Sequence, residues 1–361
     1  MKKNCVVLCG GKSAEHEISL ISAQYIASLI SPEKYRVFMV CIDRQGQVHL
    51  EIQGEERAQR LPVYLRQAVP FPILYGPGIE EPVHIVFPVL HGPGGEDGIL
   101  QGWLECLNVP YVGSGVLSSA MAMDKEISKK MFLFHGLPVV PFHTVLQEHE
   151  MPSYEEAVQI CQSSDLFIKP AALGSSVGVS KVTHALEYKE KIKHAFRYGQ
   201  KVLIEQAIQG HEVECAVLGH RSPIASGVGE VVLENDGFYS YEAKYLDGGQ
   251  AQILLQARLD HIMTETVKKI ALQAFQILEC SGMARVDFFV RGHEVFLNEV
   301  NTIPGFTPIS LYPQLWAHAG ISPQELVQRL IHHGMERFQD KQKLDFFPEH
   351  LSPSITQAAV V

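Results

Sequence analysis

The sequence predicts an α/β (α+β) protein of three domains, and three features carry this prediction. Its 361 residues suffice for two or three domains that each enclose a core. Short apolar runs alternate with helical patterns over the first third of the chain, which favours an open, mostly parallel sheet there. Near the C-terminus, two runs rich in Val and Phe flank Arg291–His293 and predict a β-hairpin over residues 284–301.

The first domain is expected over residues 1–124 and begins with a strand, a turn and a helix. Residues 4–9 form an apolar run that ends at Gly10, and apolar residues recur at helical spacing from about Ser13. Its remaining predicted parts are strands at 36–42 and 84–89, helices at 97–107 and 115–135, and an insertion rich in Gly, Pro and Gln at 44–82.

The second and third domains are expected over residues 125–212 and 213–338. In the second, Ser153 and Glu156 form a capping box that opens a helix. Its other predicted parts are strands at 166–169, 177–182 and 201–206 and a Gly/Ser loop at 174–178. The third is predicted to contain strands at 213–219 and 228–233, a polar loop at 235–250, a helix at 260–279, the hairpin and a helix opened by Ser322–Glu325. Residues 339–361 lack periodicity and are expected to form a loosely packed tail.

Polar residues gather on one face of the predicted hairpin. In the simplest register Phe289 faces Val295, Asp287 faces Leu297 and Arg285 faces Glu299. Side chains alternate along a strand, so Arg285, Asp287, Glu299 and Asn301 share a face. Oxygen ligands at this density suit Mg²⁺ bound together with phosphate oxygens. A cross-strand ion pair between Arg285 and Glu299 is the simpler alternative, but a second carboxylate and an adjacent amide favour the metal.

Composition excludes several classes of function. The formal charge of −10 and the lack of a basic tract argue against general nucleic-acid binding. The seven cysteines form no C-x-x-C pair and lie mostly in apolar runs, which favours reduced thiols in a cytoplasmic protein. No apolar segment reaches the roughly 20 residues of a membrane helix, and the apolar run at the start is too short for a signal peptide.

Two glycine-rich turns follow strands of the first domain. The turn Gly10–Ser13 is not a P-loop, because Val6 stands where that motif needs glycine. It brings Glu15 and Glu17 to a helix N-terminus, where carboxylates are favourable for dipole reasons alone, although one of them could hold a ligand's ammonium group. The loop His91–Gly98 follows an apolar strand, and such positions bind ligands in open α/β sheets; a tight turn capped by Asp97 is the alternative.

The second and third domains carry the stronger signals for phosphate binding. Lys169 ends a buried strand, and the small residues around Ser175 and Ser176 let backbone N–H groups approach an anion. Glu205 and Glu212 could bind a ribose or an amine, although either could equally be a solvated acid. The polar loop containing Tyr241–Tyr245 is long enough to be a lid or simply a surface loop.

Together, these motifs are similar to those of a known family. In order, they are Gly10-Gly-Lys-Ser-Ala-Glu-His-Glu-Ile-Ser19, His91-Gly-Pro-Gly-Gly-Glu-Asp-Gly98, Met123-Asp-Lys125, Lys169-Pro170, Gly174-Ser-Ser-Val-Gly178, Tyr241-Glu-Ala-Lys-Tyr245, Arg285-Val-Asp287 and Asn298-Glu-Val-Asn-Thr-Ile-Pro-Gly-Phe-Thr-Pro-Ile-Ser-Leu311. The series, over about residues 4–335, resembles the D-alanine–D-alanine ligase family of the ATP-grasp superfamily. The resemblance implies a three-domain ATP-grasp fold with an N-terminal, Rossmann-like open parallel-sheet domain.

The resemblance also implies roles for individual residues in ATP and metal binding. Two Mg²⁺ or Mn²⁺ ions would be bound by Asp287, Glu299 and Asn301. The phosphates would meet Lys125, Lys169, Lys244, Ser175 and Ser176, and the adenosine end would meet Glu205, Gln206, Ala207, Ile208 and Glu212.

The amino-acid substrates and the chemistry follow from the same resemblance. Glu15 and His91 would hold the first D-alanine, and Ser310 and Leu311 would receive the carboxylate of the second. ATP would convert the first carboxylate to a D-alanyl phosphate, and Arg285 and the Gly305 N–H would stabilise the oxyanion formed by amine attack. Glu15, Ser175 and Tyr245 would close the lid. The family further implies a cytoplasmic homodimer that supplies peptidoglycan precursors.

Three alternatives stay open from the sequence. A D-alanine–D-lactate ligase would use similar machinery, but relatives of that kind carry Phe at the lid position, so Tyr245 favours the dipeptide. A catalytically silent nucleotide sensor should lack a metal ligand or a lysine, and none is missing here. A carboxylate–amine ligase with other substrates is the third alternative.

Overall fold

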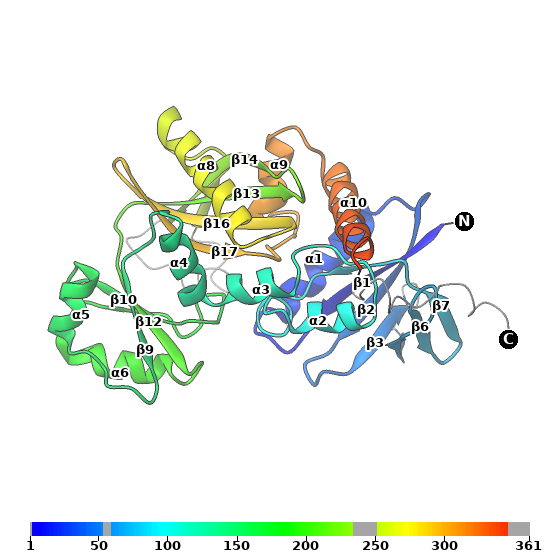
Figure 1. Ribbon diagram of the computed structural model, residues 1–361, viewed down its shortest axis with the longest axis horizontal. Coiled ribbons are helices and arrows are strands. Elements are labelled where there is room, and N and C mark those ends of the chain that lie inside the picture. The colour runs from blue at the N-terminus through cyan, green and yellow to red at the C-terminus, as the bar shows by residue number, and fades with distance from the viewer. Residues whose placement is uncertain (1, 53–58, 234–250, 346–361) are drawn as a thin grey trace.

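The computed structural model describes residues 2–52, 59–233 and 251–345, and it arranges them around three main β-sheets (Figure 1). The N-terminal sheet has the strand order β4-β3-β2-β1-β8. Its parallel strands are β1 (Lys3–Gly10), β2 (Tyr35–Ile42) and β8 (Ile85–Pro88), as the sequence predicts. The antiparallel strands β3 (Val48–Ile52) and β4 (Gln59–Pro62) extend it at one edge.

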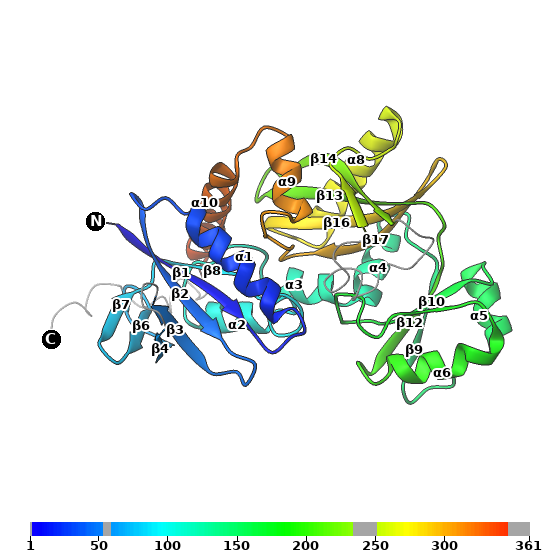
Figure 2. The same cartoon turned by 180° about the vertical axis from the view of Figure 1, so that it is seen from behind.

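Helices cover both faces of the N-terminal sheet. Helix α1 (His16–Leu29) lies across β1 and β2 in Figure 2, and α10 (Pro323–Gln342) packs into the same core. Helix α2 (Ile99–Cys106) covers the other face through Leu100 and Leu104. The inserted segment, apart from β3 and β4, forms a small antiparallel sheet of β5 (Tyr64–Arg66), β6 (Ile73–Gly76) and β7 (Ile79–Pro82).

The middle sheet is antiparallel, with the order β11-β10-β12-β9. After α3 (Val116–Met123) and α4 (Lys125–Phe134), its elements are β9 (Phe142–Leu146), α5 (Tyr154–Cys161), β10 (Leu166–Pro170), β11 (Ser180–Val182), α6 (Ala185–Ala195) and β12 (Lys201–Gln206). Ser153 and Glu156 form the predicted capping box. Residues from both helices of this unit, such as Ala157 and Ile192, pack on the sheet in a core of their own.

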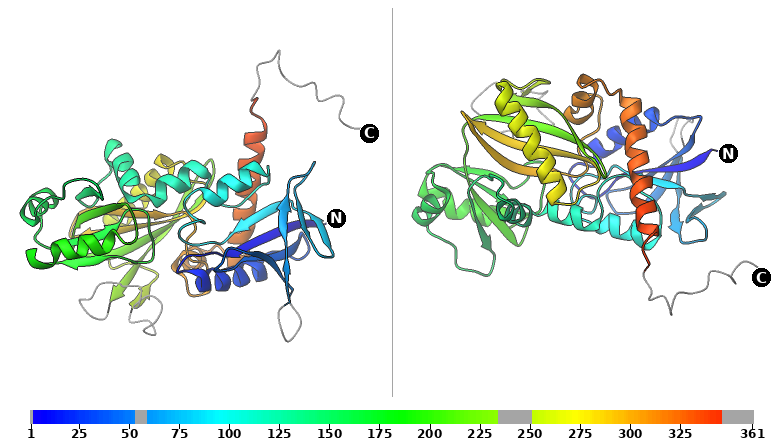
Figure 3. Two further views of the ribbon diagram at one scale, coloured as in Figure 1. Left: turned by 90° about the horizontal axis from the view of Figure 1, so that it is seen from below. Right: turned by 45° about the horizontal axis from the view of Figure 1, so that its top comes forward.

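The third sheet is also antiparallel and runs β15-β14-β13-β16-β17. Its elements are β13 (His211–Gly219), β14 (Ile224–Leu233), β15 (Ala251–Leu254), α8 (His261–Ile277), β16 (Gly282–Arg291), β17 (Glu294–Asn301) and α9 (Leu311–His318). Helix α8 lies along one face of this sheet in Figure 3, and Phe132 of α4 joins the same core. Helix α9 packs elsewhere, in the core shared with α1 and α10, so the first and third sheets are joined.

The predicted register of the hairpin is wrong, because the turn has two residues instead of the predicted three and a β-bulge follows it. The turn is Gly292-His293, which pairs Arg291 with Glu294 and Phe288 with Leu297. The register then shifts by one residue, so that Asp287 faces Glu299 and Arg285 faces Asn301. Asn298 is the extra residue that the bulge accommodates.

The expected boundary of the tail is also too early. Helix α10 continues beyond residue 338 to Gln342. Asp340 accepts a hydrogen bond of 3.0 Å from Arg221 Nε, and Lys341 forms an ion pair with Glu105, so this last turn is anchored at both sides. Residues 346–361 of the expected tail lie outside the described residues.

Among the helices that the structure describes, none is both long and apolar enough to cross a bilayer. The longest, α10, carries charged residues on most of its turns.

One buried hydroxyl joins three elements of the first unit. Ser19 on α1 accepts a hydrogen bond of 2.7 Å from the Gly10 backbone N–H and donates one of 2.5 Å to the Val89 carbonyl. The turn after β1 and the end of β8 are thereby held to the helix, and Ser19 is fully buried.

The replacement Ser19→Ala is expected to lower the free energy of unfolding by about 1–3 kcal/mol, because it leaves a buried N–H and a buried carbonyl without this partner. Urea unfolding followed by circular dichroism measures the change. Ser28→Ala is the matched control on the same helix, since its exposed hydroxyl bonds only to the Tyr25 carbonyl; it should cost about 0.5 kcal/mol or less. Equal losses in both variants would contradict the linking role of Ser19.

Candidate active site

Three carboxylates stand side by side on neighbouring strands of the third sheet. Glu214 on β13 pairs in register with Asp287 on β16, and Asp287 pairs with Glu299 on β17. Residues that are directly opposite one another point to the same face of a sheet. The opposite face of these strands carries Val213, Val286 and Val300 in a core, so the acidic row lies on the face that points away from this core.

The bulge at Asn298 is what brings Glu299 into this row. Continuing the register set by the two-residue turn would pair Asp287 with Asn298 and turn Glu299 into the core, because a shift by one residue reverses the face. The extra residue in the bulge shifts the alternation of side chains by one, so that Glu299 points to the same face as Asp287. Asn298 instead reaches Lys169, whose Nζ donates a hydrogen bond of 3.2 Å to the Asn298 Oδ1.

Arg285 and Asn301 bind the central carboxylate of the row. The Arg285 Nε and Nη2 donate to the two oxygens of Asp287 at 2.8 and 2.7 Å, and Nε lies 3.0 Å from Glu214 Oε2. The Asn301 amide donates to Asp287 Oδ2 at 3.1 Å. Arg285 thus forms a bidentate pair with Asp287 on its own strand, whereas the alternative to a metal site considered from the sequence was a cross-strand ion pair with Glu299.

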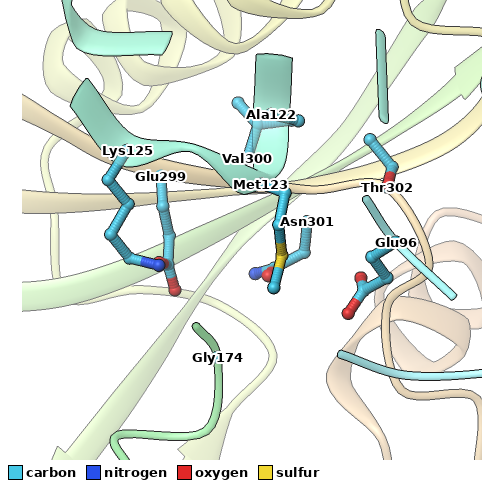
Figure 4. Close-up of a pocket in the computed structure, with 9 residues that line it drawn as sticks. All are labelled: Glu96, Ala122, Met123, Lys125, Gly174, Glu299, Val300, Asn301 and Thr302. Atoms are coloured by element: carbon cyan, nitrogen blue, oxygen red, sulfur yellow. The ribbon is translucent and has the colours of Figure 1, made fainter. Parts of the chain in front are cut away.

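Glu299 is paired with a lysine from another unit. Lys125, the first residue of α4, has its Nζ 3.0 Å from Glu299 Oε2 and donates to the Leu173 carbonyl at 2.9 Å. Figure 4 shows these two side chains meeting at one end of a pocket whose other end holds Glu96. Lys125 thus ties the third sheet to the loop that begins at Gly174.

A second group of charges is fully enclosed beside the row. Glu205 on β12 lies 2.6 Å from Lys169 Nζ and 3.2 Å from Lys129 Nζ. Burial lowers the pKa of Lys129 to about 8, partly offset by the Glu205 carboxylate. Burial alone would raise the pKa of Glu205, but the two lysines hold it below its ordinary value. The Glu205 carboxylate is therefore shared by the ammonium groups of Lys129 and Lys169, which leaves an excess of positive charge around Glu205.

Loops from the first and second units meet at Glu15. A Cβ atom built on Gly92 would lie 3.0 Å from Glu15 Oε2, and one built on Gly174 would lie 3.6 Å away. The carboxylate of Glu15 therefore sits between the His91–Gly98 turn and the Gly/Ser loop. At the Gly92 turn the backbone φ is +75°, which favours glycine for a second reason.

His91 and Glu96 are held beside Glu15 in their neutral forms. His91 Nδ1 lies 2.9 Å from the Ile303 carbonyl, which can only accept, so Nδ1 carries the proton. Its Nε2 is buried and has no hydrogen-bond partner within the described part of the chain. Burial lowers the pKa of His91, while burial and the nearby Glu15 raise the pKa of Glu96 to about 8. Glu96 accepts hydrogen bonds from the backbone N–H groups of Gly92 and Ile303.

Ser310 marks another side of the site. It is the N-cap of α9, and its Oγ accepts a hydrogen bond of 2.9 Å from the Thr307 N–H. A Cβ on Gly305 would lie 3.1 Å from that oxygen, so the two predicted residues are neighbours. The side chain of Leu311 is buried in the core, so only its backbone can face a ligand.

The remaining predicted residues are divided between described and undescribed segments. Ser175 and Ser176 both have positive φ, at 55° and 58°, a strained conformation that recurs at functional sites. Gln206, Ala207 and Ile208 leave the end of β12, and Glu212 lies on β13. Lys244 and Tyr245 lie outside the described residues.

Sequence reasoning missed three residues of this site. Glu96 was inside a recognised loop, and Glu214 lies two residues beyond Glu212 on the same strand. Lys129 follows Lys125 by four residues, so helical spacing could have indicated it.

The free protein should lose stability as the pH rises from about 5 to 8, because the unfolded chain releases the Glu96 proton near pH 4.5 and the folded protein holds it to about pH 8. Glu96→Gln removes the titratable carboxyl group. The decrease in the free energy of unfolding between about pH 5 and 8 should therefore become smaller by up to a few kcal/mol, as measured by urea unfolding at several pH values. Asp97→Asn is the control, since Asp97 accepts its hydrogen bonds within its own loop, from Gly94 and Ile99. An unchanged slope in Glu96→Gln would refute the neutral carboxyl.

Comparison with known proteins identifies the family. The model of the D-ala D-ala ligase N-terminus matches residues 4–114, and that of the D-ala D-ala ligase C-terminus matches residues 131–332. Among curated relatives, a D-alanine–D-alanine ligase of Oceanobacillus iheyensis is 41% identical, covering 95% of this chain and 98% of the relative. A D-alanine–D-alanine ligase of Coxiella burnetii is 40% identical, covering 95% of this chain and 96% of the relative.

Solved structures agree with the sequence comparison. The D-alanine–D-alanine ligase from Coxiella burnetii superposes with a TM-score of 0.85 at 36% identity, over 95% of this chain and 96% of that one. VanG, a D-Ala:D-Ser ligase from Enterococcus faecalis, superposes with a TM-score of 0.81 at 35% sequence identity, over 92% of this chain and 100% of that one. The sheets and helices described above are thus an ATP-grasp fold, and the chain belongs to the D-alanine–D-alanine ligase family of ATP-dependent ligases, which makes D-alanyl-D-alanine for peptidoglycan synthesis.

Proposed function

We propose that this protein joins two D-alanines to D-alanyl-D-alanine through a D-alanyl phosphate formed with ATP. The observation that carries the proposal is the acidic row Glu214–Asp287–Glu299 with Lys125 and Arg285 at its side. A carboxylate is a poor acyl donor, and its phosphorylation mainly requires positioning and neutralisation of phosphate charge.

Asp287, Glu299 and Asn301 are the proposed ligands of two Mg²⁺ or Mn²⁺ ions. The donor set consists of hard oxygens, and three carboxylates in one row are a strong attraction for divalent cations. Asp287 keeps unused lone pairs beside its bonds from Arg285 and Asn301. When bound, the ions would neutralise charge on the phosphate oxygens.

The nucleotide is proposed to lie between the second and third sheets. Lys125, Lys169, Lys244 and the Ser175–Ser176 backbone would contact its phosphates, and Lys129 shares Glu205 with Lys169. The N–H groups of Gln206 and Ala207 already bond to the Pro141 and Asp165 carbonyls. An adenine at 206–208 would therefore use the carbonyls of this segment and the Ile208 N–H, with Glu205 and Glu212 on the rest of the adenosine.

The first D-alanine is proposed to bind by its ammonium group between Glu15 and His91. With the proton fixed on Nδ1, the lone pair of His91 Nε2 is an acceptor for an N–H of that group. Glu15 supplies the opposite charge and adjoins the Gly174 end of the Gly/Ser loop. Glu15, Ser175 and Tyr245 are the proposed link that excludes water from the acyl phosphate.

The second D-alanine is proposed to place its carboxylate at the N-terminus of α9. Ser310 and the backbone of Leu311 are the donors there, and a helix N-terminus favours an anion. Attack by its amine would generate an oxyanion, for which Arg285 and the Gly305 N–H are the proposed donors. The resemblance to the family makes a cytoplasmic homodimer the proposed working form of this protein.

Purified protein with Mg²⁺ and ATP should release ADP only when D-alanine is present and should form a dipeptide, identified by mass spectrometry. L-alanine is the matched control. Acceptor choice is tested by adding D-serine, which the name of the similar VanG protein suggests, or D-lactate to the D-alanine. A mixed product in excess of dipeptide would overturn D-alanine as the preferred acceptor, and absence of ADP would support a silent nucleotide sensor.

Asp287→Asn and Glu299→Gln should each reduce kcat/KM at least about 100-fold, a loss of about 2.7 kcal/mol, because they remove charge from the proposed metal ligands. Circular dichroism should show an intact fold. Glu294→Gln on the same strand is the control, since Glu294 is paired with Arg291 at the hairpin tip. Activity near that of the unmodified protein in both ligand variants would refute the metal assignment.

A further inference from the structure

A second constellation of ligand-type side chains lies in the N-terminal unit, on its own strands. Cys41 on β2 and His49 and Glu51 on β3 each offer one ligand atom, and these atoms all lie within 4.8 Å of one another. The strand register explains the grouping. Cys41 pairs directly with His49, and Glu51 follows two residues later on the same face.

His49 carries an observation that points to a missing partner. Its side chain is only 6% exposed, and its Nε2 is buried without a hydrogen-bond partner among the residues that the structure describes. A buried polar atom in that state costs free energy unless a further group satisfies it. The neighbouring Cys41 is 1% exposed and Glu51 is partly exposed, so two of the three ligands are enclosed by protein.

The ligand atoms of Cys41, His49 and Glu51 indicate which class of metal ion would bind. Thiolate, imidazole and carboxylate together favour Zn²⁺ over Mg²⁺, which prefers oxygen ligands alone. In a tetrahedral Zn²⁺ site neighbouring ligand atoms are separated by about 3.3–3.8 Å, so small side-chain rotations would close the group around an ion. Cys9, which pairs with Cys41 across the parallel strands β1 and β2, or a water molecule would supply the fourth ligand.

Charged neighbours do not block such an ion. Arg60 faces Glu51 from β4 and would compete for that carboxylate, whereas Asp43 adds negative charge near His49. The cluster also backs onto the first ligand loop: a Cβ on Gly10 would lie 3.0 Å from Cys41 Sγ and 3.1 Å from His16 Cε1. An ion here would hold β2 to β3 beside the turn that follows β1 and leads to Glu15.

We propose that Cys41, His49 and Glu51 form a binding site for Zn²⁺ or a similar thiophilic divalent ion, separate from the acidic row of the third sheet.

Titration of the full-length, reduced protein with Co²⁺, in excess Mg²⁺ to fill the oxygen-ligand site, tests the proposal. One equivalent should produce the near-ultraviolet thiolate-to-Co²⁺ band, and added Zn²⁺ should abolish it. Asp287, Glu299 and Asn301 contain no sulfur, so ions bound there give no such band. The test is therefore independent of the ligase activity.

Cys41→Ser and His49→Gln should each lose the one-equivalent band, with circular dichroism checking their folds. Cys106→Ser, which removes an exposed thiol on α2, should keep it. As a second readout, Zn²⁺ should raise the Tm of the unmodified protein and of Cys106→Ser, but not of His49→Gln. Absence of the band in the unmodified protein, or its persistence in a folded Cys41→Ser protein, would overturn the proposal.

Discussion

The mutual repulsion of three carboxylates in register is the constraint around which this molecule is arranged. Like charges that are directly opposite on neighbouring strands are destabilising, yet Glu214, Asp287 and Glu299 occupy three adjacent strands. The cost is offset on two sides. Arg285 binds two members of the row, and the valines on the opposite face of the same strands are buried in the core of the third unit.

The remaining compensation comes from the second unit. Lys125 reaches Glu299 from α4, while Lys169 from β10 reaches Asn298 and Glu205. These polar contacts join units whose apolar cores differ: the middle sheet has a core of its own, whereas the first and third share one through α9 and α10. The second and third units are therefore bridged by charged side chains that the proposed phosphate chain and its ions would rearrange.

Much of this could be predicted from the sequence, and the failures have physical causes. The parallel strands and the capping box at Ser153 follow from local patterns. The shared face of Asp287 and Glu299 was also predicted, because the assumed three-residue turn has the same parity as the actual two-residue turn plus one bulge residue. The bulge could not be predicted, because no residue of the hairpin is a signal for it. The indirect indication is that a two-residue turn without a bulge would point either Asp287 or Glu299 into the core. Lys129, Glu96 and Glu214 were missed because their roles depend on partners more than 60 residues away or on another strand.

Protonation links the two halves of the site. After burial, the neighbouring carboxyl groups of Glu15 and Glu299 contribute to the raised pKa of Glu96, because its ionisation would add a negative charge next to theirs. The free protein avoids this by keeping the proton on Glu96, just as His91 avoids a buried positive charge by staying neutral. A bound ammonium group beside Glu15, or divalent ions beside Glu299, would favour the ionised form of Glu96 instead. Binding of the proposed ligands would therefore be coupled to proton release from Glu96, the carboxyl that sequence reasoning missed.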